Sequence, residues 1–111
     1  MPDVPLEIGC AEVAALVKRD AGVVLLDCRE PDEHAIGVIP GAMLLPMSQL
    51  QDRIADVTSH PGERIIVYCH HGGRSLRVAH FLRQQGVTHA QSMAGGIDEW
   101  SATIDPSIPR Y

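Results

Sequence analysis

Two short apolar runs constrain the fold of this 111-residue chain more than any other feature. The first is Val-Val-Leu-Leu at 23–26, and the second is Ile-Ile-Val-Tyr at 65–68. A continuous apolar run of this length, bounded by polar or glycine-containing segments, is typical of a strand covered on both faces, as in a parallel sheet. We therefore expect the two runs to form buried strands.

Helical patterns alternate with these runs. Apolar side chains recur at helical spacing within 10–19, and Gly86 is a natural end for the helix that follows the second run. The other expected elements are helices at 30–34, 46–57 (with Leu50 and Ile54 inward) and 97–100, and strands at 42–45, 63–68 and 89–93. Strands that alternate with helices favour an α/β layer fold with a mainly parallel sheet.

The segment after the second run carries the chemistry that the sequence offers. It is a loop of seven residues that leads into a helix: Cys69, His70, His71, Gly72, Gly73, Arg74 and Ser75. Ligands collect at the carboxyl ends of parallel strands, and the unpaired N–H groups at a helix start favour an anion. A cysteine there should ionise below the ordinary thiol value of about 8.5. We expect a Cys69 thiolate with a second anion beside it.

Composition excludes several classes of function. The formal charge is -5 and no segment is rich in Lys or Arg, so we expect no nucleic-acid partner. No apolar run approaches membrane-spanning length, and the start of the chain lacks a basic, apolar leader, so we expect a cytoplasmic protein with no membrane partner. Three irregularly spaced cysteines favour reduced thiols over a disulfide framework.

Several blocks resemble the rhodanese-like sulfurtransferase family, and they follow the family's order along nearly the whole chain. They are residues 26–31 with 37–42, residues 65–75, and residues 95–97 with Trp100. The ending at 105–111 is similar to the tails of bacterial single-domain members. The resemblance implies one rhodanese-like domain over residues 1–111, with a five-stranded parallel sheet flanked by helices on both faces.

The resemblance also implies a reaction. Cys69 would take a sulfane sulfur from thiosulfate or a persulfide donor, hold it as a persulfide, and pass it to a thiol or cyanide. The main-chain amides of residues 70–75 are expected to curve around the anionic sulfur, because Gly72 and Gly73 permit a positive φ. No cofactor is implied, and a thiol-bearing protein could serve as a partner.

Charged residues near the ends of the strands are expected to support the loop. Asp27 and Arg29 lie two residues apart at a strand end, so they share one side of it, and we expect a bracing ion pair. Glu33 is a further candidate partner for Arg29. Arg74 leaves two roles open: its guanidinium could orient an anionic donor, or it could pair with a carboxylate and brace the loop.

The other cysteines and the loop histidines have simpler expected roles. A metal site built from Cys69, His70 and His71 is not expected, because adjacent residues rarely converge on one ion. The two histidines are expected to be exposed and to face opposite ways, with a role in acceptor approach as the alternative. Cys28 is expected in the core, with a role as resolving thiol as the alternative, and Cys10 is expected to be inert.

Three kinds of function stay open at this stage. The leading hypothesis is an enzyme, a thiosulfate:cyanide-type sulfurtransferase. The second is a sulfur carrier that a partner protein loads, and the third is a non-catalytic interaction module of the same family. A cysteine phosphatase or arsenate reductase is the alternative enzyme class, but the phosphatase loop is one residue longer than the four residues that separate Cys69 from Arg74.

Overall fold

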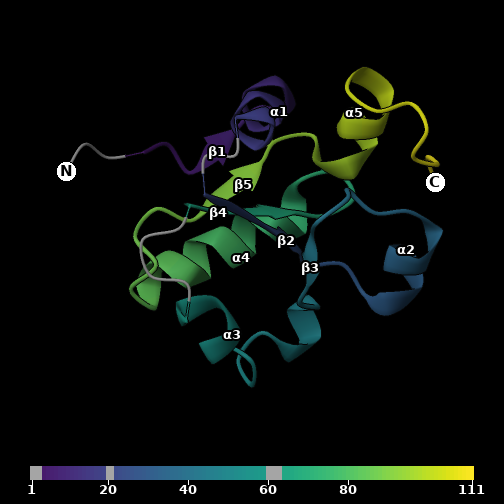
Figure 1. Cartoon of the computed structure of the whole chain (residues 1–111). Helices are drawn as coiled ribbons and strands as arrows, with labels where there is room; N and C mark the ends of the chain where they lie inside the picture. Colours follow the sequence, from purple (N-terminus) through teal and green to yellow (C-terminus); the bar gives the residue numbers. More distant parts are fainter. Residues whose placement is uncertain (1–3, 20–21, 60–63) are drawn as a thin grey trace.

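The computed structural model describes residues 4–19, 22–59 and 64–111. Within these ranges five strands form one parallel sheet in the order β1-β5-β4-β2-β3 (Figure 1). The strands are β1 (Glu7–Ile8), β2 (Val23–Asp27), β3 (Met43–Leu44), β4 (Arg64–Tyr68) and β5 (Gln91–Met93). The predicted five-stranded parallel sheet is confirmed.

The two apolar runs form the centre of this sheet. β4 is the middle strand, and β2 pairs with it from Val23 opposite Arg64 to Asp27 opposite Tyr68. Alternate side chains of β4 enter two separate cores, with Ile66 in one and Val67 in the other. Because both faces of the strand are covered, neither face needs polar residues, and the run is apolar throughout.

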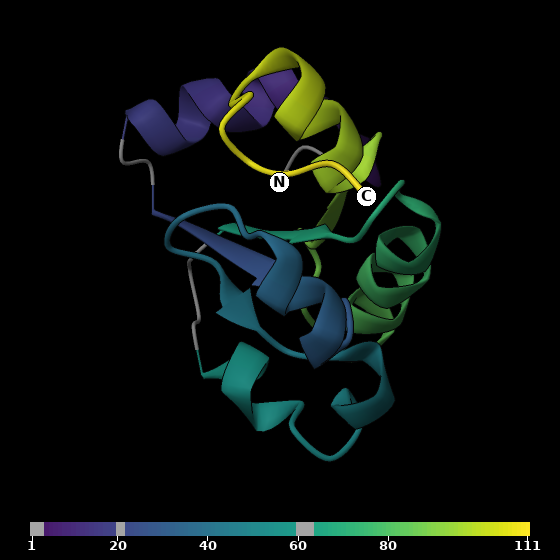
Figure 2. The same ribbon diagram turned by 90° about the vertical axis from the view of Figure 1, so that its right-hand side faces the viewer.

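Helices cover both faces of the sheet, as predicted. Within the described ranges the α-helices are α1 (Cys10–Lys18), α2 (Pro31–Ile36), α3 (Ala55–Thr58), α4 (Gly73–Gln84) and α5 (Gly96–Thr103). Figures 1 and 2 show α1 and α5 on one side of the sheet and α3 and α4 on the other. None of the helices in these ranges has both the length and the apolar character needed to cross a membrane.

The prediction of one helix over 46–57 is wrong. This stretch contains the short 3₁₀ helix η1 (Met47–Gln49), a series of turns, and α3. The N–H groups of Leu50 and Asp56 bond to carbonyls three residues back, and these bonds interrupt an α-helical ladder. Leu50 is buried and Ile54 is half-buried, so the core holds the segment although the helix is irregular.

Other boundaries differ by a few residues. Strand β1 was not predicted, because two residues are too few to show a periodic pattern. β5 begins at Gln91 rather than at residue 89. Glu63, the expected first residue of β4, lies outside the described residues. These differences leave the carboxyl ends of β2 and β4 side by side, and the candidate site lies there.

Candidate active site

Cys69 directly follows the middle strand of the sheet, in the loop between β4 and α4. Gly72 adopts a left-handed conformation with φ of 111°, and this turns the chain into the start of α4. Of the two glycines expected to permit a positive φ, only Gly72 uses it, because Gly73 is already the first residue of the helix. The loop therefore turns sharply around the cysteine side chain.

Two amide donors and one hydroxyl group lie close to the Cys69 sulfur. The amide of Gly72 lies 3.1 Å from Sγ, the amide of Ser75 lies 3.4 Å away, and the Ser75 hydroxyl lies 3.5 Å away. Cys69 itself is 1% exposed. Of the amides expected to surround the sulfur, two therefore bond to it directly, and the sulfur is almost completely enclosed.

These contacts favour the ionised form of the cysteine. The interaction with Cys28 lowers the pKa of Cys69 most, whereas burial raises this pKa. The bonds from Ser75 and Gly72 lower it further. Together they lower the pKa of Cys69 from 9.0 to about 4, so a thiolate predominates at neutral pH. The same interaction and burial raise the pKa of Cys28, which stays a thiol.

The start of α5 determines which way the loop's peptide groups point. The amide of Ile97 donates to the Cys69 carbonyl at 2.9 Å, and the amide of Asp98 donates to the His70 carbonyl at 3.1 Å. Gly96 packs so closely that a Cβ there would collide with both carbonyls. The loop's carbonyls therefore face α5, while the Gly72 and Ser75 amides face the sulfur. The sequence did not predict this contact between α5 and the loop, although the Gly95-Gly96 pair is a pattern typical of a close backbone approach.

Arg74 pairs with a carboxylate. Its guanidinium makes two bonds to Glu33, at 2.6 and 2.8 Å, and the Tyr111 hydroxyl donates to the same carboxylate at 2.8 Å. The bonds from Arg74 lower the pKa of Glu33 most, burial opposes them, and Tyr111 lowers it further, to about 2. Of the two roles left open for Arg74, this geometry supplies the bracing role.

Asp27 and Arg29 form a completely buried ion pair. Arg29 bonds to both carboxylate oxygens of Asp27, at 2.9 and 2.7 Å, and also binds the backbone carbonyl of Glu33. The expected pair between Arg29 and the Glu33 carboxylate is therefore wrong, because Arg74 occupies that carboxylate. Burial raises the pKa of Asp27, but bonds from Arg29 and His34 outweigh it and the pKa is lowered. The pair anchors the residues beside the loop.

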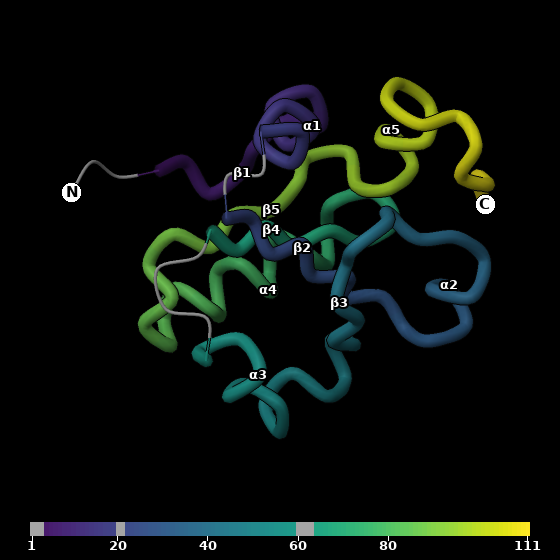
Figure 3. The backbone as a smooth tube through the Cα atoms, in the orientation of Figure 1, coloured from purple at the N-terminus to yellow at the C-terminus, as the bar shows by residue number. Residues whose placement is uncertain are grey.

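The loop histidines do not face opposite ways. The His70 ring stacks between His71 and Tyr111, with ring centres 3.8 Å apart in each case. Figure 3 traces the backbone from α5 back towards α2, the path that brings Tyr111 to this position. His71 is exposed as expected, whereas His70 is half-buried and its Nε2 has no hydrogen-bond partner within the described structure.

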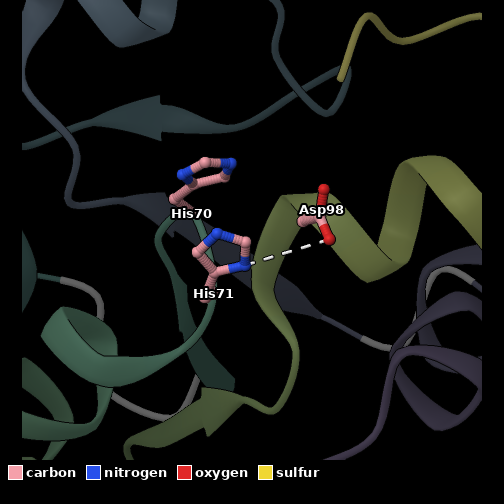
Figure 4. Close-up of side chains that lie close together, drawn as sticks. All are labelled: His70, His71 and Asp98. Atoms are coloured by element: carbon pink, nitrogen blue, oxygen red, sulfur yellow. Dashed lines mark ion pairs between the residues drawn. The ribbon is translucent and has the colours of Figure 1, made fainter. Parts of the chain in front are cut away.

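His70, His71 and Asp98 form a cluster of potential metal ligands beside the loop (Figure 4). One ligand atom from each lies within 4.8 Å of the others, and His71 Nδ1 is 3.8 Å from Asp98 Oδ2. Cys69 does not belong to this cluster, which therefore differs from the set weighed in the sequence. Arg110 bonds to both oxygens of Asp98 at 3.1 Å, so the carboxylate already has a cationic partner.

Comparison with known proteins places this geometry in context. The family model described as "Rhodanese-like domain" matches residues 10–103. The chain is 38% identical to the "Thiosulfate sulfurtransferase GlpE" of Stutzerimonas stutzeri, with 81% of each chain covered. It is 40% identical to the "Rhodanese-like/PpiC domain-containing protein 12, chloroplastic" of Arabidopsis thaliana, with 78% of this chain covered, and it spans only 30% of that longer protein.

A solved structure shows the same fold. The human single-domain sulfurtransferase TSTD1 superposes with a TM-score of 0.78 at 26% identity, and the match covers 90% of this chain and 98% of the human chain. The shared architecture extends over nearly all of both chains. The fold around Cys69 is thus one that relatives named as sulfurtransferases also have.

Proposed function

This chain belongs to the rhodanese-like domain family, and we propose that it is a sulfurtransferase whose Cys69 carries sulfur as a persulfide. Relatives named as sulfurtransferases support this activity in general, and such an activity requires a sulfur donor and an acceptor. The observation that carries the proposal is the Cys69 sulfur, which faces the amides of Gly72 and Ser75 at the end of β4. The chemistry requires a stabilised thiolate there.

The proposed reaction has two steps. The Cys69 thiolate attacks the outer sulfur of thiosulfate or of a persulfide donor, the sulfur–sulfur bond of the donor breaks, and sulfite or a thiolate leaves with the electron pair. A thiol or cyanide then attacks the outer sulfur of the Cys69 persulfide, and the Cys69 thiolate is released. The Gly72 and Ser75 amides stabilise negative charge throughout, and a comparable anion site loses about 3 kcal/mol when one donor is removed.

The enclosure of Cys69 limits how donors approach. Because the residue is 1% exposed, a donor reaches the sulfur only when neighbouring side chains move. The same enclosure would protect the outer sulfur of the persulfide from water.

Intact-mass analysis tests the proposal. We expect one added sulfur after exposure to thiosulfate or glutathione persulfide, with the addition mapped to Cys69 by peptide analysis. Cyanide should remove the added sulfur and yield thiocyanate. Cys69→Ser should neither gain sulfur nor transfer it. Full transfer activity in Cys69→Ser would show that the proposal is wrong.

The paired state of Arg74 favours a second candidate, a sulfur carrier loaded by a persulfide rather than by thiosulfate. Arg74 is the only Lys or Arg within residues 69–75, and both of its bonds to Glu33 are shorter than 3 Å. A neutralised guanidinium offers little attraction to a dianion such as thiosulfate.

Donor comparison separates the two candidates. A carrier should react about tenfold more efficiently with glutathione persulfide than with thiosulfate. Glu33→Gln, which removes the charge that neutralises Arg74, should lower the KM for thiosulfate and leave the KM for glutathione persulfide nearly unchanged. Rapid turnover of thiosulfate at low concentration by the unaltered protein would contradict the carrier hypothesis.

A further inference from the structure

A second cysteine lies next to Cys69 on the neighbouring strand. The paired register of β2 and β4 ends with Asp27 opposite Tyr68, so the next facing residues are Cys28 and Cys69. The ladder continues into this position, because the Cys28 amide donates to the Tyr68 carbonyl at 3.1 Å. Neighbouring strands lie about 4.8 Å apart, which is within the range of Cα separations of about 4.4–6.8 Å that a disulfide can bridge.

The two cysteine side chains point to the same face of the sheet. Side chains alternate along each strand, and Leu26 and Cys28 of one strand share a core cluster with Val67 and Cys69 of the other. Both cysteines are 1% exposed, and Cys28 is the neighbour that lowers the pKa of Cys69 most. Cys28 thus approaches Cys69 from the neighbouring strand and the core, whereas the stabilising amides approach it from the loop.

We propose that Cys28 is a resolving thiol that attacks the Cys69 persulfide when no acceptor arrives, releasing hydrosulfide and leaving a Cys28–Cys69 disulfide. The inference rests on the proposed function, because it requires the persulfide. It assigns the buried Cys28 thiol a reaction of its own, and it adds hydrosulfide release to the activities of the site.

The step balances without an external oxidant. A bond forms between the sulfurs of Cys28 and Cys69, and the bond between the Cys69 sulfur and the outer sulfur breaks. The outer sulfur leaves as hydrosulfide with the bonding electron pair and the proton of the Cys28 thiol. The sulfane sulfur is reduced, and the two cysteines are oxidised to the disulfide. A thiol such as glutathione would then reduce the disulfide by exchange and regenerate Cys69.

The structure also explains why Cys28 would react only after the Cys69 persulfide has formed. The interaction with Cys69, and then burial, raise the pKa of Cys28, so it is held as an unreactive thiol while Cys69 is a thiolate. In the persulfide, the Cys69 sulfur becomes an electrophile bonded to a leaving group. Departure of that group provides an acceptor for the Cys28 proton.

Anaerobic single-loading experiments test the proposal, because they exclude oxygen as an oxidant. The full chain is loaded with thiosulfate, the donor is removed, and intact mass and released hydrosulfide are followed over time. We expect the added sulfur to disappear with release of one hydrosulfide per chain, loss of two hydrogens, and a disulfide mapped to Cys28 and Cys69. In Cys28→Ala and Cys28→Ser the persulfide should persist about tenfold longer or more.

Cys10→Ala is the matched control, because Cys10 is equally buried but lies in the core cluster on the other face of the sheet. It should release hydrosulfide at the rate of the unaltered chain. An added sulfur that decays equally in the unaltered chain and in both Cys28 variants, with no disulfide, would overturn the inference and leave the proposed function standing. Failure of Cys69 to gain sulfur from thiosulfate or glutathione persulfide would overturn both.

Discussion

Cys69 and Cys10 are both almost completely buried, but the Cys69 sulfur faces backbone N–H groups whereas the Cys10 sulfur faces backbone carbonyl oxygens. The Cys69 sulfur accepts hydrogen bonds from the amides of Gly72 and Ser75. The Cys10 thiol instead donates weakly to the carbonyls of Ala94 and Gly96, at 3.6 and 3.8 Å. Burial raises the pKa of Cys10 most, and Glu99 raises it further, to about 12.

Burial alone therefore does not decide whether a cysteine in this protein is reactive. It raises the pKa of both thiols, and the neighbouring groups decide the net result. Hydrogen bonds from Cys28, Ser75 and Gly72 outweigh burial at Cys69, whereas Glu99 adds to the effect of burial at Cys10. Gly96 lies between the two environments. Its carbonyl faces Cys10, while the amides of the next two residues hold the carbonyls of Cys69 and His70 away from the Cys69 sulfur.

The sharpest test of this contrast is selective alkylation. At pH 7, a thiol with a pKa of about 4 is essentially all thiolate, whereas the fraction is about 10⁻⁵ for a pKa of about 12. We expect iodoacetamide to modify Cys69 with a rate that is flat from pH 6 to 8 and to leave Cys10 unmodified, as measured by peptide mass analysis. Equal labelling of the two residues would refute the contrast.

Replacing Gly96 should disrupt the close packing between α5 and the loop that contains Cys69. Gly96→Ala would place a Cβ against the carbonyls of Cys69 and His70 at a residue with φ of 62°, so we expect a loss of about 3 kcal/mol or more in the free energy of unfolding. Gly73→Ala is the matched control, since an added Cβ meets no atom within 4 Å. It should change stability by less than about 1 kcal/mol. Urea unfolding measures both, and equal losses would contradict the close packing at Gly96.

The two cysteines should change the pH dependence of stability in opposite directions. For Cys69 the folded pKa of about 4 lies below the unfolded value of 9.0, so its stabilisation is complete above pH 9 and is lost as pH falls towards 4. For Cys10 the folded pKa of about 12 lies above 9.0, so its contribution is present below pH 9 and is lost as pH rises towards 12.

Urea unfolding of Cys69→Ser and Cys10→Ala across this pH range measures the two contributions. Relative to the unaltered chain, Cys69→Ser should lack part of the rise in stability between pH 4 and 9. Cys10→Ala should lack part of the decline between pH 9 and 12. Stability curves that run parallel in all three proteins would show that neither thiol has a shifted pKa.

The smallest expected effect comes from removing the Ser75 hydroxyl beside the Cys69 sulfur. Ser75→Ala removes the hydroxyl that lies 3.5 Å from the Cys69 sulfur but keeps the Ser75 amide. We expect the pKa of Cys69 to rise by less than about one unit, read from the pH profile of alkylation. Ser92→Ala is the control, because Ser92 bonds to the Ser75 hydroxyl and makes no bond to the sulfur within the described structure. A larger shift in Ser92→Ala than in Ser75→Ala would contradict the direct bond.

Local pattern was sufficient to predict the central part of the fold. The runs at 23–26 and 65–68 are apolar at every position because both of their faces are covered, and this signal lies within a few neighbouring residues. The loop from Cys69 to Ser75 was recognisable for the same reason, because its glycines and its place between strand and helix are local features. The prediction of one continuous helix over 46–57 was wrong, since the irregular hydrogen bonds of this segment depend on how Leu50 and Ile54 pack in the core.

The sequence by itself determined which cysteine follows the middle strand and precedes a helix. Only the tertiary structure decided what surrounds it: Cys28 on the next strand, the start of α5 against the loop carbonyls, and Glu33 on Arg74. These neighbours are far apart along the chain, and the strand order β1-β5-β4-β2-β3 brings them together. The ionisation of Cys69 depends on that assembly, because the direction of each surrounding dipole is fixed by packing between elements rather than by local sequence.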